Sequence, residues 1–392
     1  MKAKRRLAII GAGPLGLEAA LRGVRRGWDV TVYEKGQVGN HCLQWGHVQL
    51  FTQLRDNVGP FTTEILPELP ELSAVLTGRQ FVERVLGPLA DSPLLKGAVQ
   101  ENTEVLAVAR RRTRKMELPG HPLRMDRPFQ LLVRSAEGER IVEADAVLDA
   151  SGVYGTPNWT GESGIPCAGE REAGPAVVRH IPDISGTHRS EWAGKDILVV
   201  GNGHSAATVI VWLEEVRRDN GATRVHWVVN TDRARPCVEV SNDPLPSRQS
   251  TVRAANDLAE RPPDGWRVYR RSSLLTLRGL AGGASEAVVG RPETPHRCRV
   301  HRVVSLTGYR PDMSILEELQ LNVSPVTGGA GGLARSLMDI KDCLSPVVVS
   351  PESLASGEKN FFVIGHKSYG RLNNFLMRTG REQLDTIFTL LS

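Results

Sequence analysis

The sequence predicts an α/β fold made of two Rossmann-like dinucleotide-binding domains, because two similar glycine-rich turns occur in one chain of 392 residues. The first, at residues 11–16, reads Gly-Ala-Gly-Pro-Leu-Gly, and the second, at residues 201–206, reads Gly-Asn-Gly-His-Ser-Ala. Each turn directly follows a short apolar run and opens a helical pattern, which is the order of strand, turn and helix found where proteins bind dinucleotides. Two such turns predict that this chain holds two dinucleotides at once.

The length and composition are typical of a two-domain enzyme that works in water. Lys and Arg together number 49 against 44 Asp and Glu, which gives a formal charge of +5 that is dispersed along the chain. We interpret this modest excess as suited to anionic cofactors, and we expect no nucleic-acid partner. No apolar stretch reaches the roughly 18 residues that a membrane span requires, and the basic residues 1–6 run directly into a strand. We therefore expect a cytoplasmic protein with no membrane partner.

The first glycine turn can be interpreted position by position. Residues 7–10 form an apolar run typical of a strand that is covered on both faces. Gly11 then permits a tight turn, Gly13 lets a pyrophosphate approach the backbone, and Gly16 lets the next helix pack closely on its strand. The phosphates would rest on free amide groups where the helix begins. The residues of this turn that we expect to contact the cofactor are Gly11, Gly13, Pro14, Leu15 and Gly16.

A carboxylate follows the next predicted strand, residues 29–33. Glu34 stands about 20 residues beyond the glycines, where an acidic side chain accepts hydrogen bonds from both ribose hydroxyls of an adenosine. Lys35 follows it directly. In combination with the strand and the turn, Glu34 predicts an adenine dinucleotide site, and we include Glu34 and Lys35 among its contacts.

The second turn has the same plan with two differences. Its strand is predicted at residues 196–200, Gly201 and Gly203 take the turn, and Ala206 replaces the third glycine with another small residue. The following strand, residues 224–229, ends without the carboxylate that the first unit carries. The residues of this turn that we expect to contact a second dinucleotide are Gly201, Gly203, His204, Ser205 and Ala206.

Two arginines close to the end of that strand bear on the choice of nucleotide. An acidic residue would repel a 2′-phosphate, whereas the guanidinium groups of Arg233 and Arg235 can grip it in a forked geometry. This favours NADPH over NADH, although Asp232 adds an opposing charge. The alternative interpretation is that both arginines are solvated loop residues.

Two further segments, at residues 148–152 and 304–311, each place a small residue and a glycine after a strand end. In this set of four motifs the chain resembles the flavoprotein superfamily that includes thioredoxin reductase, glutathione reductase and the flavin-containing monooxygenases. The resemblance implies FAD and NADPH as cofactors, an FAD domain built from residues 1–155 and 300–392, and an NADPH domain built from residues 156–299. It adds Gly152, Gly308 and Tyr309 to the expected cofactor contacts.

The cysteines argue against dithiol chemistry. They stand at positions 42, 167, 237, 298 and 343, odd in number and with no Cys-x-x-Cys pair. Residues 42–47 resemble the Cys-x-x-x-x-Cys redox segment of the glutathione reductase group, but His47 replaces the second cysteine, so no resolving thiol is available. Cys42 is either a small buried residue or a functional thiol, and His47 is either a hydrogen-bonded structural histidine or a functional one. We include His47 as a catalytic candidate and Gln44 and Trp45 as cofactor contacts.

The C-terminal flavin segment indicates a branch of the superfamily. Disulfide reductases present a Gly-Asp pair whose carboxylate meets the ribityl chain, whereas here Gly365 is followed by His366. Both are included as cofactor contacts, and residues 367–375 follow closely enough to face the isoalloxazine or the substrate. This segment, residues 307–311 and the second glycine turn are most similar to a divergent flavin-containing or N-hydroxylating monooxygenase of class B.

That resemblance implies a chemistry in two halves. NADPH would reduce the flavin, O₂ would form a C4a-hydroperoxyflavin, and one oxygen would pass to a small nucleophilic metabolite, by N-hydroxylation of an amine or by S-oxidation. Asn57 is a candidate donor to the peroxide, because an uncharged amide stabilises it without protonating it; equally, it is a turn-forming Asn ahead of Gly-Pro. The expected partners are a small substrate and O₂, with no metal.

Two other functions stay open at this point. One is an NAD(P)H-dependent flavin reductase or oxidase that transfers no oxygen to a substrate. The other is a flavin-based redox sensor that uses its cofactor to report on the redox state. The sequence does not identify the substrate.

Overall fold

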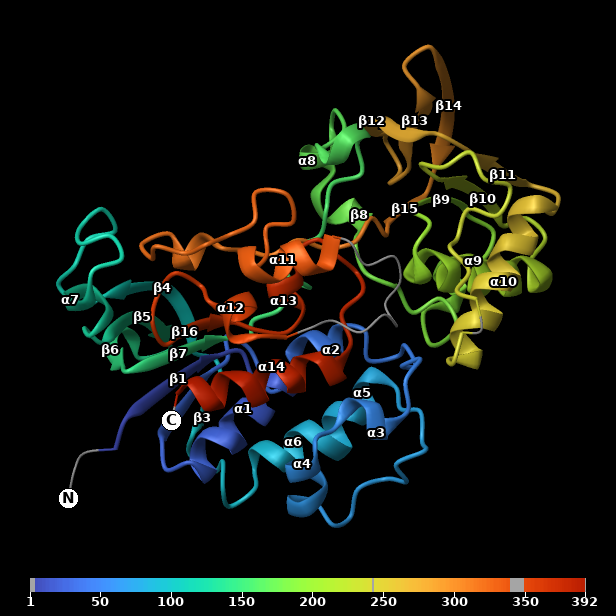
Figure 1. Ribbon diagram of the computed structural model, residues 1–392. Coiled ribbons are helices and arrows are strands. Elements are labelled where there is room, and N and C mark those ends of the chain that lie inside the picture. The colour runs from blue at the N-terminus through green and yellow to red at the C-terminus, as the bar shows by residue number, and fades with distance from the viewer. Residues whose placement is uncertain (1–3, 242, 339–348, 392) are drawn as a thin grey trace. The chain divides into compact units, whose positions relative to one another are not determined.

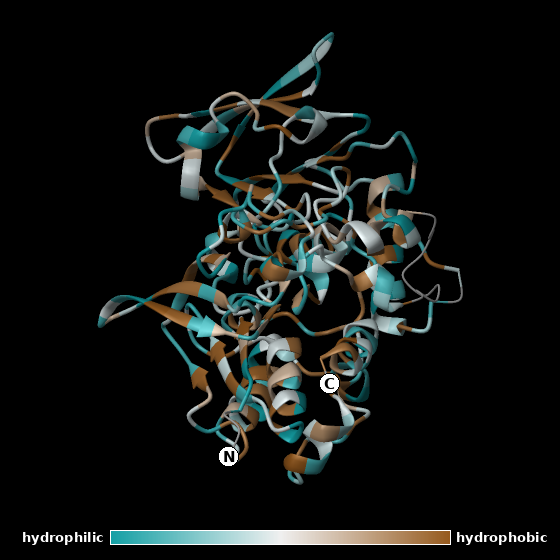
Figure 2. Cartoon of the chain, turned by 60° about the vertical axis from the view of Figure 1, so that its left-hand side comes forward, coloured by the Kyte–Doolittle hydropathy of each residue, from teal (hydrophilic) through white to brown (hydrophobic). Residues whose placement is uncertain are grey.

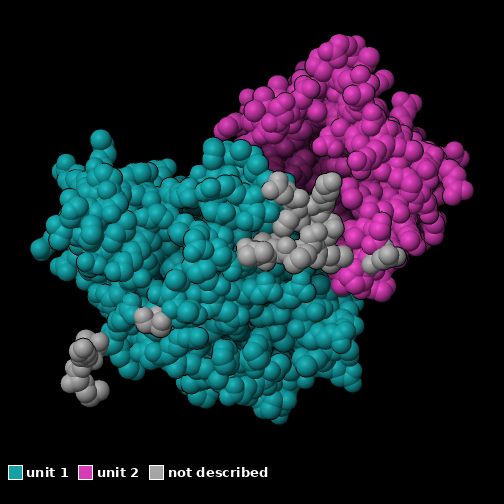
Figure 3. All heavy atoms as spheres, viewed as in Figure 1, with its two compact units in different colours: residues 1–156, 309–392 teal, residues 157–308 magenta. Residues whose placement is uncertain are grey.

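The computed structural model describes residues 4–241, 243–338 and 349–391. The chain divides into two compact units (Figure 3): unit 1 comprises Met1–Thr156 and Tyr309–Ser392, and unit 2 comprises Pro157–Gly308. The chain thus leaves unit 1 once and returns to it once. Each unit is described below by itself.

Unit 1 is built on a five-stranded parallel sheet in the order β16-β7-β1-β2-β3 (Figure 1). Its strands are β1 (Arg6–Ile10), β2 (Asp29–Tyr33), β3 (Val99–Gln100), β7 (Ala146–Asp149) and β16 (Phe361–Val363). The strand that leads into the first glycine turn, β1, lies at the centre of the sheet. This order is the doubly wound arrangement whose carboxyl edge binds nucleotides.

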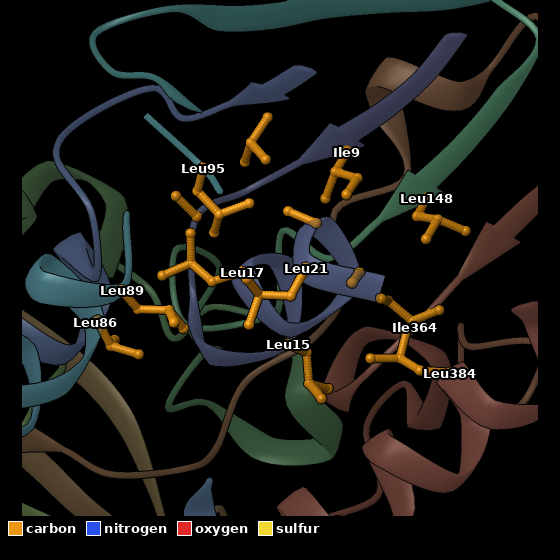
Figure 4. Packing of buried hydrophobic residues seen from close by; sticks show 14 of the residues in the cluster. Ile9, Leu15, Leu17, Leu21, Leu86, Leu89, Leu95, Leu148, Ile364 and Leu384 are labelled. Carbon is orange, nitrogen blue, oxygen red and sulfur yellow. The ribbon is translucent and has the colours of Figure 1, made fainter. Parts of the chain in front are cut away.

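The central strand is apolar on both faces because both faces are covered. Leu7 and Ile9 face a cluster that contains the helices α1 (Pro14–Arg25) and α14 (Met377–Leu390), shown in Figure 4. Ala8 and Ile10 face a second cluster, formed with an antiparallel sheet on the other side. That second sheet consists of β4 (Glu104–Arg110), β5 (Phe129–Ser135) and β6 (Gly138–Ala144).

The remaining helices of unit 1 are mostly short and lie in the long connections between strands (Figure 1). A π-helical turn at Val82–Leu86 joins two of them, α5 and α6, into one continuous segment. These remaining helices of unit 1 are α2 (Asn40–Gln44), α3 (Leu54–Asn57), α4 (Pro60–Ile65), α5 (Gly78–Phe81), α6 (Gly87–Ala90), α7 (Pro122–Met125), α11 (Gly331–Met338), α12 (Pro351–Leu354) and α13 (His366–Tyr369).

Unit 2 repeats the plan with a parallel sheet in the order β11-β10-β9-β15-β8. Its strands are β8 (Val177–Val178), β9 (Asp196–Val200), β10 (Arg224–Val228), β11 (Trp266–Tyr269) and β15 (Arg302–Ser305), and its helices are α8 (Glu170–Ala173), α9 (His204–Asp219) and α10 (Pro246–Glu260). The central strand β9 again alternates, with Ile197 and Val199 in one cluster and Leu198 and Val200 in another.

The second cluster of unit 2 is closed by an antiparallel sheet of three strands, β12 (Ser273–Gly279), β13 (Ser285–Arg291) and β14 (Thr294–Val300). Hydrophobic colour follows the strands inside the molecule in Figure 2, whereas the tips of projecting hairpins are hydrophilic. Both units therefore place a parallel sheet between a helical layer and a small antiparallel sheet. This confirms the α/β class and the two Rossmann-like halves that the sequence predicts.

The boundary of unit 2 differs from the predicted one at its C-terminal end. The sequence predicts that the second domain ends at residue 299, but β15 pairs in parallel with β9 and belongs to the sheet of unit 2. A strand-end pattern predicts that a chain changes direction, but the sheet that the strand joins depends on pairing with distant residues. The compact unit accordingly runs to Gly308.

Candidate cofactor sites

The first glycine turn is shaped by contacts that exclude side chains. Gly11 has a φ of +99°, and its amide donates to the carbonyl of Tyr33 at 2.8 Å. A Cβ placed on Gly16 would lie 1.9 Å from the carbonyl oxygen of Gly11. Because backbone atoms form that contact, both positions require glycine for the helix to start so close to its strand.

The start of α1 is open to an anion. Its N-cap residue is Gly13, which offers no side chain to bind the first amide groups of the helix. Nothing lies within 4 Å of the position that a Cβ of Gly13 would take. Free amide groups and the positive end of the helix dipole therefore meet open space, which fits a phosphate.

Glu34 connects the turn to the end of β2. The side chain is 8% exposed, its Oε2 accepts from the amide of Ala12 at 2.8 Å, and its Oε1 accepts from the amide of Gly36 at 2.9 Å. Each carboxylate oxygen has a second lone pair. The carboxylate is thus fixed by the backbone and retains acceptors for the hydroxyl groups of a ribose.

A cavity of about 290 Å³ lies along these groups in unit 1. Six residues predicted as cofactor contacts line it: Gly11, Gly13, Pro14, Glu34, Lys35 and Gly152. The sequence did not single out several others, among them Asn40, His41, Thr156 and Asp312. Only the folded chain shows these, because they come from three separate stretches. The cavity extends from the Glu34 carboxylate past the first glycine turn, as the binding of a dinucleotide requires.

Several predicted contacts lie outside this cavity lining. Leu15 packs behind the turn, and a Cβ on Gly365 would lie 2.8 Å from the Cδ1 atom of Leu15. Gln44 is exposed, and Trp45 lies against Gly78, whose Cβ would meet the indole at 2.5 Å. Gly16 and Gly365 likewise shape the backbone without lining the cavity. These positions support the fold around the site.

Two aromatic side chains follow the segments where the chain leaves and re-enters unit 1. The rings of Tyr154 and Tyr309 have centroids 4.8 Å apart, and His41 lies 5.6 Å from Tyr154. Burial raises the pKa of Tyr309 to about 12, so its hydroxyl stays protonated at neutral pH. The preceding residue, Gly308, belongs to unit 2, where its carbonyl accepts from the amide of Asn158 at 2.9 Å.

The predicted residues with candidate chemistry are held by their neighbours. Asn57 donates from Nδ2 to the carbonyl of Gln53 and to the hydroxyl of Thr52, both at 2.9 Å. These bonds hold the amide at the end of α3 to the two residues that precede this helix. His366 has its Nε2 3.0 Å from the carbonyl of Leu372, and burial lowers the pKa of its imidazole. His47 is half-buried in the loop after α2.

The second glycine turn has the same backbone geometry. Gly201 has a φ of +127°, and its Cβ would lie 2.3 Å from the carbonyl oxygen of Leu306. Gly203 is the N-cap of α9, again without a side-chain cap and with open space where a Cβ would stand. Ala206 is fully buried. The start of α9 is thus as open to an anion as the start of α1, and His204 and Ser205 form its first turn.

The two predicted phosphate-binding arginines differ in their surroundings. Arg235 is within 2.8 Å of three carboxylates, which raise the pKa of its guanidinium; they belong to Asp257, Glu239 and Glu260. In this structure these carboxylates pair with the Arg235 guanidinium, and its role as a 2′-phosphate ligand stays a prediction. Arg233 is exposed and its guanidinium takes part in no ion pair among the described residues. The sequence around the two arginines does not distinguish Arg233 from Arg235, because the three carboxylates that pair with Arg235 stand at later positions in the chain.

A further buried charge pair lies close to the second turn. Arg248 binds Asp243 through two hydrogen bonds of 2.7 and 2.6 Å. Burial and the neighbouring Arg248 lower the pKa of His204. The sequence did not predict this pair, because lone charges on a loop and a helix give no periodic pattern.

The four cysteines that the structure describes form no disulfide, and one of them, Cys42, lines the cavity of unit 1. Burial raises the pKa of the Cys42 thiol to about 12. It raises the pKa of Cys237 to about 12 as well, and those of Cys167 and Cys298 to about 11. Cys343 lies outside the described residues. A thiol with such a pKa is a poor nucleophile at neutral pH.

The chain belongs to the pyridine nucleotide-disulphide oxidoreductase family, whose model matches residues 5–329. The family binds FAD and NAD(P)H, the two cofactors expected from the sequence. A dihydrolipoyl dehydrogenase from Chlorobaculum parvum is 43% identical over 49 residues, which is 12% of this chain and 10% of that enzyme. The chain is therefore an oxidoreductase of this family, while so short a match does not extend to the activity of that enzyme.

Solved structures of several enzymes share the fold over nearly the whole chain. A bacillithiol disulfide reductase from Bacillus cereus has a TM-score of 0.69 at 17% identity, with 99% of each chain covered. An ornithine N-hydroxylase from Kutzneria, with reduced FAD, NADP⁺ and L-ornithine, has a TM-score of 0.64 at 15% identity over both full chains. A cadaverine monooxygenase from Erwinia amylovora, bound to FAD, has a TM-score of 0.65 at 14% identity, covering 100% of this chain and 95% of that one.

Neither a membrane-spanning helix nor a metal-binding cluster occurs among the described residues. None of their helices is long and apolar enough to cross a membrane. Within the same residues, no group of three or more His, Cys, Asp or Glu side chains is placed to hold a metal ion.

Proposed function

We propose that the protein is an NADPH-dependent FAD monooxygenase that oxygenates a small nucleophilic metabolite, most readily by N-hydroxylating an amine. The observation that carries this proposal is the state of Cys42. It stands in the segment that resembles the redox stretch of the glutathione reductase group and lines the cavity of unit 1, but burial raises the pKa of its thiol to about 12 and His47 replaces the second cysteine. The lack of a second thiol in this segment supports a reaction in which the flavin passes its electrons to O₂ rather than to a protein dithiol.

The fold supports the same proposal. It is shared with an ornithine N-hydroxylase and a cadaverine monooxygenase, whose substrates are small amines. S-oxidation of a sulfide is the second reaction that the proposal includes, because sulfur is a soft nucleophile as well.

Unit 1 fits FAD. The Glu34 carboxylate would bind the adenosine ribose, and the open amide groups at Gly13 would bind the pyrophosphate. The remaining predicted contacts along the cavity are Gly11, Pro14, Lys35 and Gly152. When bound, FAD supplies the capacity to accept a hydride and to react with O₂, and the protein supplies position and exclusion of water.

Unit 2 fits NADPH. The uncapped start of α9 at Gly203 would bind its pyrophosphate, and Arg233 would bind the 2′-phosphate, since no carboxylate stands at the end of β10. Asn57 and His47 remain the catalytic candidates. For Asn57 to donate to a reacting oxygen, its amide would have to exchange the hydrogen bonds to residues 52 and 53.

Oxygen incorporation tests the proposal. The FAD-loaded protein is mixed with NADPH, ¹⁸O₂ and a panel of small amines and sulfides that includes L-ornithine and cadaverine. Mass spectrometry then looks for one labelled oxygen in a product, and NADPH consumption is measured in parallel. We expect labelled product with at least one amine. Hydrogen peroxide in stoichiometric yield with every compound would overturn oxygen transfer.

The second candidate is an NAD(P)H-dependent flavin reductase or oxidase, and the fold shared with a bacillithiol disulfide reductase favours it. The variant Cys42→Ser distinguishes disulfide reduction from the other reactions. If the protein reduced disulfides through Cys42, this variant would lose NADPH-dependent turnover. We expect that turnover to be retained, because a buried, protonated thiol takes no part in it.

A further inference from the structure

A buried ion pair in unit 1 has no role in the function proposed above. Lys367 is 1% exposed and Asp149 is fully buried. The Nζ atom of Lys367 lies 2.6 Å from Oδ2 of Asp149 and donates to the hydroxyl of Ser151 at 2.9 Å. Such pairing is required, because an ion without a partner is costly to remove from water.

The pair lies at the nucleotide edge of the parallel sheet. Asp149 ends β7, and Lys367 follows the neighbouring strand β16 in α13. Since the carboxyl ends of parallel strands meet at one edge, both residues lie on the edge that carries the first glycine turn. A Cβ on Gly11 would lie 3.1 Å from the Cα atom of Ser151. Ser151 therefore contacts both the turn and the ammonium group.

The ammonium group has one donor to spare. It carries three N–H groups, and Asp149 and Ser151 accept from two of them. Among the residues that the structure describes, no third acceptor is in place. Lys367 nevertheless lines the 290 Å³ cavity together with Gly11 and Gly13. A buried cation with a free donor that lines the same cavity as an uncapped helix start is suited to an anionic oxygen.

Asp312 is a carboxylate that lines the same cavity and interacts with the charge of Lys367. Burial acts to raise the pKa of the Asp312 carboxyl. Hydrogen bonds from Ser314 and the charges of Lys367 and Lys35 outweigh burial and lower that pKa. Asp312 and Lys35 both line the same cavity.

We propose that Lys367 is a cofactor contact whose ammonium donates to a pyrophosphate oxygen of the dinucleotide bound in unit 1. Asp149 is then a positioning residue, which with Ser151 holds the ammonium at the cavity wall. The inference rests on the FAD site of the proposed function. His366, which stands where disulfide reductases carry a carboxylate, turns to the carbonyl of Leu372, and the next residue brings a cation instead.

The dissociation constant of FAD from the apo-protein tests this contact, measured by flavin fluorescence at several salt concentrations. Lys367→Met should weaken FAD binding about 10- to 100-fold, the effect of losing a charge-assisted hydrogen bond, and should make binding less sensitive to salt. Lys359→Met is the matched control, because Lys359 is an exposed lysine of the same unit that pairs with Asp126. It should leave FAD binding unchanged.

A double variant keeps the test valid if the single variant misfolds. Lys367→Met leaves the Asp149 carboxylate buried and unpaired, which destabilises the fold, whereas Lys367→Met/Asp149→Leu removes both charges. We expect the double variant to melt near the wild-type temperature and still to bind FAD weakly. Wild-type affinity in a folded double variant would overturn the inference and leave the proposed function intact. If the wild type binds no FAD, both fail.

Discussion

The two glycine turns have the same backbone geometry but differ in what surrounds them. Gly11 and Gly201 both adopt a positive φ, and Gly13 and Gly203 both begin an uncapped helix. In unit 1 a carboxylate at the end of the second strand binds the turn itself, through the amide of Ala12. In unit 2 the equivalent strand, β10, ends at Val228 without a carboxylate directly after it, and Asp232, Arg233 and Arg235 follow a few residues later. The difference indicates that the turn selects a dinucleotide, while the end of the second strand selects which one.

The third position of each turn gives the largest expected effect. Gly16→Ala would place a methyl group 1.9 Å from the carbonyl oxygen of Gly11. We expect it to destabilise unit 1 by about 3 kcal/mol and to lower FAD retention, because backbone atoms must move. Ala206 already carries a methyl group in the buried equivalent position, so Ala206→Gly should cost only about 1 kcal/mol. Denaturant unfolding measures both, and equal losses would contradict the comparison.

The carboxylate that distinguishes the two sites gives the next effect. Glu34→Ala leaves the amides of Ala12 and Gly36 without their acceptor. FAD should bind about 10- to 100-fold more weakly, since hydrogen bonds to a charged group contribute about 1.5–3 kcal/mol. Isothermal titration of the apo-protein with FAD checks this.

Transplanting the charge sharpens the same comparison. Thr231→Glu places a carboxylate just beyond the end of β10, where it would repel a 2′-phosphate. We expect the KM for NADPH to rise about tenfold while the KM for NADH stays unchanged. Thr231→Gln serves as the uncharged control. A similar rise for both nucleotides would indicate a structural defect rather than repulsion.

Arg233 and Arg235 allow a smaller, paired test. Arg233→Ala should raise the KM for NADPH several-fold and leave NADH unaffected, because its exposed guanidinium is the one available to the 2′-phosphate. Arg235→Ala should leave the ratio of the two KM values unchanged, since three carboxylates already neutralise that side chain. Steady-state kinetics with both nucleotides decide, and the opposite pattern would assign phosphate binding to Arg235.

Sequence reasoning predicted the parts of this molecule that local patterns control. In each unit the apolar run, β1 or β9, is followed directly by its glycine turn, and in unit 1 the Glu34 carboxylate stands within about 30 residues of both. Such patterns depend on neighbouring positions in the sequence. The fold class and the cofactor pair followed from them.

The missed features depend on residues far apart in the chain. Lys367 and Asp149 are 218 positions apart, and no periodicity links them. The neutralised state of Arg235 depends on side chains of α10, and β15 joined the sheet of unit 2 through its pairing with β9. Charge pairs and sheet membership are tertiary properties, so a motif predicts that a residue is present at a site but not whether its charge is available.

The smallest expected effect concerns acid stability. Burial lowers the pKa of His226 in unit 2 and of His366 in unit 1, so both stay neutral in the folded protein at pH values where the unfolded chain binds a proton. Their contribution to stability is complete above the unfolded value of about 6.5 and is lost as the pH falls below it, with a slope of at most about 1.4 kcal/mol per pH unit for each.

The variants His226→Gln and His366→Gln test whether these histidines make the protein less stable as the pH falls. Each should flatten the decline in unfolding free energy between neutral and mildly acidic pH, measured by denaturant titration at each pH. His188→Gln is the control of opposite sign, because hydrogen bonding to Glu191 raises the pKa of this exposed histidine. A steeper acid decline in His226→Gln than in the wild type would mean that the folded protein stabilises the charged form of this imidazole.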